Sequence, residues 1–225
     1  FPSTDADIVI NSSIHGLDSP QIFGNTTLLS GDQYRLMRQD FHDILVTPIE
    51  QRRRLTLCFG GSDPARLTLP MLEAIEHVSP IKTVTAITGP GFTQMAELAT
   101  FLKHTTLDVD VLQNVQEMAP IWLDTRLAIS AAGGSQFELA ACATPSVLVV
   151  VADNQVASSE NAAKEGWAKV HYFDSKKREG INSIINDITT LWQNPKQIST
   201  MHELVRGKYD GLGAKRIVEY MLSTS

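Results

Sequence analysis

Two glycine-rich stretches of this sequence could bind an anion. Gly60, Gly61 and Ser62 follow the apolar run LTLCF, and a second Gly-Gly-Ser group begins at Gly133, after the apolar run RLAIS. Glycine allows backbone N–H groups to approach a phosphate closely, and the start of the following helix adds partial positive charge. Neither stretch has the spacing of the dinucleotide-binding fingerprint or of the P-loop, so NAD binding and Mg-ATP hydrolysis receive little support.

The same residues also have a purely structural explanation. Glycine-rich turns are common between strands and helices, and Ser62 and Ser135 could be ordinary N-caps of the helices that follow. Two such turns at one edge of the same sheet favour an anion site, because ligands of open parallel sheets bind beyond the carboxyl ends of the strands.

Polar residues near the second stretch could recognise a sugar. Glu138 lies three residues after Ser135 in an otherwise apolar segment. Its carboxylate could accept hydrogen bonds from the two hydroxyls of a ribose, or it could form a capping box with Ser135. Asp153, Asn154 and Gln155 end the next apolar run, where they form either a turn or a group of sugar-binding side chains.

Strand-like and helix-like segments alternate from Leu55 onward. This alternation predicts an α/β fold with a doubly wound, Rossmann-like parallel sheet over residues 51–225. The run SVLVVVA is apolar throughout, as expected for a central strand with both faces buried. Residues 1–50 hold the strand-like segment ADIVINSS and a further short strand with a turn. Because a single strand with no crossover partner cannot bury itself, residues 1–50 are expected to be a remnant of an N-terminal domain and an interdomain linker.

Composition restricts the class of function. A net charge of -6 and a pI near 5.5 argue against nucleic-acid binding. The basic run Arg52-Arg53-Arg54 is expected to lie in a solvated loop. Cys58 and Cys142 lie inside apolar runs, where free, buried thiols are expected.

The sequence also lacks several recognisable signals. No apolar run approaches the roughly 20 residues that a membrane span needs, and no signal-peptide pattern is visible, so a cytoplasmic location is expected. No cluster of His, Cys, Asp and Glu has the spacing of metal ligands, so neither a metal nor another cofactor is expected.

Taken together, these residues resemble the nucleotide-binding C-terminal half of a GT-B fold. The sequence is similar to the N-acetylglucosaminyltransferases of peptidoglycan synthesis (the MurG type). It resembles more closely the UDP-sugar hydrolases of pseudaminic acid synthesis, the PseG/SpsG family. The segments that carry the closer resemblance are GDQYRLMRQDF, LCFGGSDP, NVQEMA, AISAAGGSQFELAACATPSVLVVVADNQ and YDGLGAKRIVEYM.

This resemblance implies a site for UDP or a UDP-sugar. The residues that would bind the diphosphate are Gly60, Gly61, Ser62, Gly133, Gly134 and Ser135. Glu138 would hold the ribose, and Val115 would meet the uracil through its backbone with Met118 packed nearby. The residues that would face the diphosphate or the sugar are Asp153, Asn154 and Gln155.

In the hydrolase family, water attacks the anomeric carbon and UDP leaves, activated by a histidine from a G-x-G-H-x-x-R loop of the N-terminal domain. That loop does not occur in this sequence, and none of the six histidines has its context. His15, the nearest, is expected to be a loop residue. We therefore expect no catalytic residue in this chain and a missing N-terminal domain that closes the cleft. The alternatives are a GT-B glycosyltransferase with a UDP-sugar donor and a non-catalytic nucleotide-sugar-binding module.

Overall fold

The chain forms two compact units. The computed structural model describes residues 6–12, 26–77, 81–174 and 180–224. Unit 1 combines the two ends of the chain, Phe1–Leu45 and Gly207–Ser225, and unit 2 is the continuous segment Val46–Arg206.

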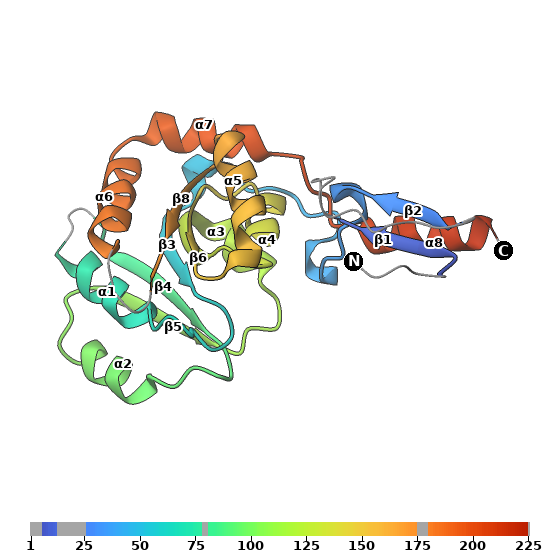
Figure 1. Cartoon of the computed structure of the whole chain (residues 1–225). Coiled ribbons are helices and arrows are strands. Elements are labelled where there is room, and N and C mark those ends of the chain that lie inside the picture. The colour runs from blue at the N-terminus through green and yellow to red at the C-terminus, as the bar shows by residue number, and fades with distance from the viewer. Residues whose placement is uncertain (1–5, 13–25, 78–80, 175–179, 225) are drawn as a thin grey trace. The chain divides into compact units, whose positions relative to one another are not determined.

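Unit 2 is built on a six-stranded sheet in which every pairing is parallel (Figure 1). The strand order is β5-β4-β3-β6-β7-β8. Counted from β3, this is the 3-2-1-4-5-6 order of doubly wound sheets, with its switch point between β3 and β6. The predicted α/β fold is confirmed. The strands are β3 (Arg54–Cys58), β4 (Thr83–Thr88), β5 (Asp108–Gln113), β6 (Thr125–Ala131), β7 (Ser146–Val150) and β8 (Ala168–Tyr172).

Helices cover both faces of this sheet. One face is covered by α1, α2 and α6, and the other by α3, α4 and α5 (Figure 1). This arrangement follows from right-handed crossovers that run in opposite directions away from β3 and β6. The helices of unit 2 are α1 (Thr68–Glu76), α2 (Met95–Leu102), α3 (Ala119–Asp124), α4 (Ser135–Ala141), α5 (Val156–Lys164), α6 (Ile181–Trp192) and α7 (Pro195–Val205). Short 3-10 helices cover Ile49–Gln51 and Asp153–Gln155.

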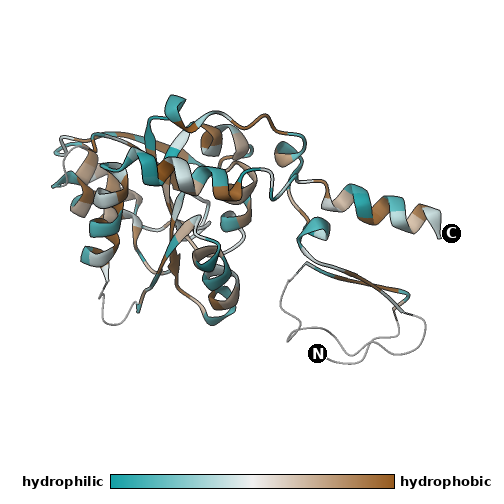
Figure 2. Cartoon of the chain, turned by 90° about the horizontal axis from the view of Figure 1, so that it is seen from above, coloured by the Kyte–Doolittle hydropathy of each residue, from teal (hydrophilic) through white to brown (hydrophobic). Residues whose placement is uncertain are grey.

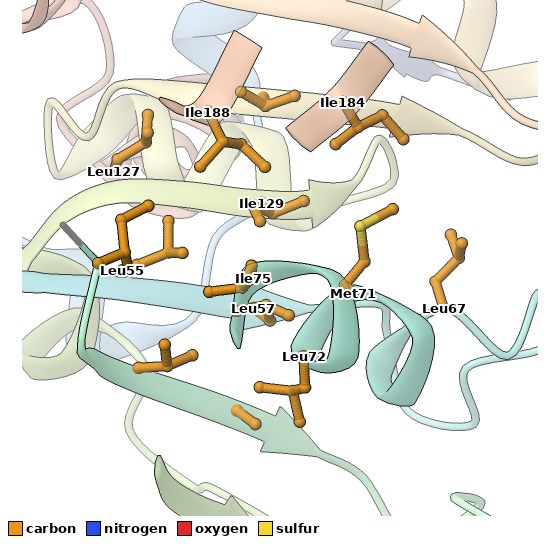
Figure 3. Close-up of a cluster of buried hydrophobic side chains, with 14 of the residues drawn as sticks. Leu55, Leu57, Leu67, Met71, Leu72, Ile75, Leu127, Ile129, Ile184 and Ile188 are labelled. Carbon is orange, nitrogen blue, oxygen red and sulfur yellow. The ribbon is translucent and has the colours of Figure 1, made fainter. Parts of the chain in front are cut away.

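The core of unit 2 lies where β3 and β6 meet α1 and α6. All five residues of β7 are buried, which matches the continuous apolar run in its sequence. Figure 3 shows the packing of the two central strands against the helices on one face. The residues labelled there are Leu55, Leu57, Leu67, Met71, Leu72, Ile75, Leu127, Ile129, Ile184 and Ile188. This packing fixes the carboxyl ends of β3 and β6 side by side.

Arg52 is fully buried, so the prediction of a solvated loop is wrong for this residue. Its guanidinium donates to the carbonyl oxygens of Thr47 at 2.8 Å, Cys142 at 2.8 Å and Trp122 at 3.3 Å. It also donates to the Thr144 hydroxyl at 3.0 Å. Burial lowers the pKa of Arg52 to about 10, which still leaves the side chain charged at neutral pH. Local sequence does not reveal this role, because the acceptors of the last three bonds lie 70 to 92 residues away.

Unit 1 pairs the first strands of the chain with its last helix. The strands β1 (Ile8–Asn11) and β2 (Thr27–Ser30) pair in parallel, so β1 does have a partner strand. The helix α8 (Gly213–Ser223) packs on the 3-10 helix Asp32–Tyr34, and a further 3-10 helix covers Gln39–Phe41. The Tyr209 hydroxyl donates to Asp32 at 3.1 Å, and Arg216 forms an ion pair with Asp210. A Cβ atom on Gly213 would lie only 2.2 Å from the carbonyl oxygen of Arg35, so the start of α8 requires glycine.

Unit 1 also exposes apolar side chains. Hydrophobic residues occur along β1 and β2 and on α8, the helix that ends at the C label in Figure 2. Among the described residues of unit 1, the exposed large hydrophobic residues are Ile10, Leu36, Leu45, Val218, Met221 and Leu222. Within the described residues of both units, every helix is too short or too polar to cross a membrane.

Replacement of Arg52 by methionine should destabilise unit 2 strongly. The variant leaves buried carbonyl oxygens without donors, and each such group costs about 1–3 kcal/mol, so we expect a loss of about 3 kcal/mol or more in the free energy of unfolding. The matched control is Arg53→Met, since Arg53 is exposed and should change stability by less than about 0.5 kcal/mol. Urea unfolding followed by the fluorescence of the buried Trp122 and Trp167 measures both. Equal stability of the two variants would contradict the structural role of Arg52.

Candidate functional site

Three loops at the carboxyl edge of the sheet carry most of the predicted site residues. They follow β3, β6 and β7, which are neighbours in the sheet (Figure 1). The first loop holds Gly60, Gly61 and Ser62, the second holds residues 133–135, and the third holds residues 153–155. The sheet order therefore brings these three groups to one edge, at the switch point where ligands of such folds bind.

The first loop rests on the loop that follows β4. Gly60 has a φ of 82°, a conformation that favours glycine, and Gly60, Gly61 and Ser62 are all exposed. The Gly91 N–H donates to the Gly61 carbonyl at 3.0 Å. A Cβ atom on Gly89 would lie 2.5 Å from Gly61 Cα, which real structures do not tolerate. Gly89 and Gly91 are thus supporting residues that the sequence analysis missed, although the motif Gly-Pro-Gly was a visible signal.

Asp63, not Ser62, accepts the N–H groups at the start of the helix that follows the first loop, whose N-cap is Leu67. The two carboxylate oxygens of Asp63 accept from the backbone N–H groups of Leu67 at 2.9 Å and Thr68 at 2.8 Å. The interpretation of Ser62 as an N-cap is therefore wrong. The helix α1 starts only at Thr68, because Arg66 just before it has a φ of 52°.

Cys58, the last residue of β3, is buried close to both loops. Burial raises the pKa of its thiol to about 11, and the charges of Glu138 and Asp63 act in the same direction, whereas the backbone of Gly60 and the side chain of Ser135 act in the opposite direction. Cys58 is therefore an uncharged thiol at neutral pH. Both cysteines are free and buried, as predicted.

Ser135 is the first residue of α4, and the N-cap is Gly134, which is exposed. The interpretations of Ser135 as an N-cap and as half of a capping box are therefore wrong, since both require serine at the cap. Glu138 lies in the first turn of α4 and is half-buried. Its Oε2 accepts a hydrogen bond from the indole N–H of Trp122, which comes from α3, at 3.3 Å.

The loop between β5 and α3 holds the two residues predicted to meet a base. It leaves β5 at Asn114, whose N–H donates to the Thr88 carbonyl at the end of β4. Val115 is half-buried, and Met118 is buried as the N-cap of α3. The loop thus begins beside the end of β4 and leads into α3. Because α3 contacts α4, its far end lies near the helix that carries Glu138.

Amide side chains order the third loop and join the helices that follow the second and third loops. Asp153 and Asn154 are exposed, whereas Gln155 is half-buried and accepts the Val151 N–H on its Oε1 at 3.0 Å. Gln136 donates from its Nε2 to the Ala132 carbonyl at 2.8 Å and to the Ser158 hydroxyl at 2.9 Å. The amide oxygen of Gln155 thus has a structural role that the sequence analysis did not anticipate.

Three described histidines have structural partners of their own. His104 places its Nδ1 2.9 Å from the Thr100 carbonyl oxygen. His202 is buried, with its Nδ1 2.6 Å from the Ala143 carbonyl oxygen, and burial lowers its pKa. His171 pairs with Asp187 at 3.0 Å. His15 lies outside the described residues. Within the described ranges, no group of three His, Cys, Asp or Glu side chains could hold a metal ion.

The fold and its loop-bearing edge place the chain in a class of proteins. A doubly wound parallel sheet of this strand order is the architecture of one half of GT-B glycosyltransferases. Residues 55–217, more than half of the chain, match the family model "Glycosyltransferase family 28 C-terminal domain". The chain belongs to this family.

Two curated proteins are similar in sequence. Uncharacterized protein MJ1062 of Methanocaldococcus jannaschii is 26% identical, with 89% of this chain and 46% of that protein covered. Spore coat polysaccharide biosynthesis protein SpsG of Bacillus subtilis is 24% identical, with 94% of this chain and 63% of that protein covered. The chain thus spans less than two thirds of the length of either relative.

Solved structures show the same fold. MurG of Acinetobacter baumannii superimposes with a TM-score of 0.67 at 18% identity, over 97% of this chain and 60% of that one. The spinosyn rhamnosyltransferase SpnG, complexed with thymidine diphosphate, gives a TM-score of 0.55 at 18% identity, over 69% of this chain and 40% of that one. At such identities the likeness establishes the fold.

Removal of the Asp63 carboxylate should destabilise the start of α1, whereas removal of the neighbouring Ser62 hydroxyl should not. Asp63→Ala leaves the backbone N–H groups of Leu67 and Thr68, at the start of α1, without acceptors. We expect it to lower the free energy of unfolding by about 1–2 kcal/mol. Ser62→Ala should change it by less than about 0.5 kcal/mol, because Ser62 is exposed. Urea titration of the two variants provides the comparison. A loss for Ser62→Ala as large as that for Asp63→Ala would show that the serine stabilises the helix after all.

Proposed function

We propose that the carboxyl edge of the six-stranded sheet binds the diphosphate and ribose of a UDP-sugar. The observation that carries this proposal is the position of the two glycine loops, which follow the neighbouring strands β3 and β6 at the junction where the strand order reverses. Backbone N–H groups of adjacent glycine loops form a concave anion site that needs no metal ion. The half-buried carboxylate of Glu138 lies beside this junction, close enough for its charge to affect the thiol of Cys58.

In this proposal each loop binds a different part of the ligand. The residues that contact the diphosphate are Gly60, Gly61, Ser62, Gly133, Gly134 and Ser135. Glu138 accepts hydrogen bonds from the ribose hydroxyls, and the loop with Val115 and Met118 contacts the base. The residues that face the sugar are Asp153, Asn154 and Gln155. The exposure of Gly60, Gly61, Ser62 and Gly134 supports this assignment, because a ligand can reach their backbone.

We further propose hydrolysis as the reaction of the complete protein. Water attacks the anomeric carbon of the sugar, the bond from that carbon to the diphosphate oxygen breaks, and UDP leaves. The negative charge that develops on the diphosphate would be stabilised by the loop N–H groups. Support comes from the motifs GGSDP and ADNQ, which the sequence shares with UDP-sugar hydrolases of pseudaminic acid synthesis, and from the similarity to SpsG.

The first alternative is a glycosyltransferase with the same donor site, in which an acceptor hydroxyl replaces water. The family match and the fold shared with MurG favour this alternative. A non-catalytic nucleotide-sugar-binding module is the second alternative. Incubation of the complete protein with a UDP-sugar distinguishes the three, because hydrolysis releases UDP without an acceptor, transfer requires one, and a binding module releases none.

The proposal includes a second lobe, which supplies the catalytic histidine and closes the cleft, and a cytoplasmic location. The greater length of both curated relatives supports the second lobe. The exposed apolar side chains of unit 1, such as Leu36, Leu45 and Leu222, would suit burial by additional chain. Free thiols at Cys58 and Cys142 are in keeping with a reducing compartment.

Replacement of Glu138 by alanine should weaken the binding of UDP without unfolding the chain. The loss of a charge-assisted hydrogen bond costs about 1.5–3 kcal/mol, which corresponds to an affinity roughly 10- to 150-fold lower. Calorimetric titration with UDP, UMP and CMP measures this effect, and UDP should bind most tightly to the unaltered chain. If Glu138→Ala lowers stability but leaves the UDP affinity unchanged, the carboxylate has only a structural role.

The 225-residue chain alone should bind UDP but release little or none from a UDP-sugar. The physical reason is that the histidine proposed to activate the reaction, from the G-x-G-H-x-x-R loop, is not among the residues of this chain. Release of UDP can be followed by a coupled assay over several hours, with the complete protein as the positive control. Sustained turnover by the chain alone would place the catalytic group within this sequence and refute the proposal that a second lobe supplies it.

A further inference from the structure

Trp122 is buried, and both its indole N–H and its backbone carbonyl oxygen form hydrogen bonds. Its side chain is fully buried, and its indole N–H donates to Glu138 Oε2 at 3.3 Å. On the other side, its carbonyl oxygen accepts from Arg52 at 3.3 Å and from the Thr144 hydroxyl at 2.9 Å. The indole therefore belongs to a rigid part of the core, while the carboxylate that it contacts lies on the first turn of α4.

A contact of this kind controls the direction of the carboxylate. Glutamate has three rotatable side-chain bonds, and a half-buried glutamate on a helix would otherwise sample several rotamers. An indole N–H can only donate a hydrogen bond, and a carboxylate oxygen can accept one. The bond from a rigid indole therefore fixes the position of one carboxylate oxygen. A carboxylate has about four lone-pair sites, so one bond from an indole does not by itself prevent it from accepting others. Orientation before binding removes an entropic cost from the binding step.

We infer that Trp122 is a positioning residue that orients the Glu138 carboxylate towards the two hydroxyls of a ribose. This inference rests on the function proposed above and deepens it. A fixed carboxylate can accept from the 2′ and 3′ hydroxyls together, which makes the site selective for ribonucleoside diphosphates over their 2′-deoxy counterparts. Trp122 thus acts on selectivity through Glu138, and it need not touch the ligand.

The test compares the dissociation constants of UDP and 2′-deoxy-UDP for the full 225-residue chain. We define the selectivity as the dissociation constant of 2′-deoxy-UDP divided by that of UDP. For the unaltered chain we expect a selectivity of about tenfold, the value of one charge-assisted hydrogen bond. Trp122→Phe should lower the selectivity to about threefold or less. It should do so mainly by raising the dissociation constant of UDP, while the affinity for 2′-deoxy-UDP stays nearly unchanged.

Trp167→Phe is the matched control. Trp167 is also buried, and its indole N–H donates to the glutamate Glu165 at 3.1 Å. It precedes β8, at the opposite edge of the sheet from the proposed site. The control should keep the full selectivity. A selectivity that falls equally in both variants would mean that the effect is a general consequence of losing a buried indole, and the inference would be overturned.

Glu138→Gln distinguishes failure of the inference from failure of the proposed function. If Glu138→Gln lowers the selectivity and Trp122→Phe does not, Glu138 holds the ribose without help from Trp122. In that outcome the proposed function stands and the inference fails. If neither variant changes the selectivity, the ribose is not bound at Glu138, and the proposed function fails with the inference.

A spectroscopic measurement covers the case in which Trp122→Phe does not fold. The indole N–H signal of Trp122 in a ¹⁵N-labelled sample should lie downfield because of its bond to a carboxylate, and it should move upfield in Glu138→Ala. The signals of Trp167 and Trp192 serve as internal references and should not move. An unchanged Trp122 signal in Glu138→Ala would overturn the inference.

Discussion

The buried guanidinium of Arg52 is the interaction on which the arrangement of unit 2 depends. Burial of a charged group is costly, and here the cost is offset by carbonyl oxygens, including those of Trp122 in α3 and Cys142 at the C-terminal end of α4. One side chain thus holds two helices together with the segment that precedes β3. The opposite ends of the same helices carry Met118 and Glu138, so a contact deep in the core determines where these side chains lie at the edge of the sheet.

The glycine loops depend on a separation of roles between neighbouring residues. Asp63 satisfies the first N–H groups of α1, which leaves Ser62 and the glycines before it unneeded for capping. The loop then lies against Gly89, where any side chain would collide with Gly61. An exposed backbone that is nevertheless held in one conformation is what recognition of an anion by N–H groups requires. The fold therefore gives this edge the exposed, fixed backbone that the proposed diphosphate site needs.

Local patterns in the sequence were enough to predict the alternating architecture, the buried strand Ser146–Val150 and the grouping of the glycine loops at one edge. They failed wherever a contact joins distant segments. The burial of Arg52 and the bond between Trp122 and Glu138 depend on residues that are adjacent only after the sheet has formed. A basic run looks the same whether its first member is solvated or buried. The assignment of Ser62 as a cap failed for another reason, since Asp63 was an equally good candidate one residue further on.

The position of Cys58 gives the protein a built-in reporter of loop movement. Thiol reagents attack the thiolate, and a pKa of about 11 together with burial leaves almost none of it available at neutral pH. Alkylation of Cys58 therefore requires a local opening that exposes the thiol to solvent. The rate of labelling at this residue, with the fully buried Cys142 as an internal reference for global unfolding, measures how often that opening occurs.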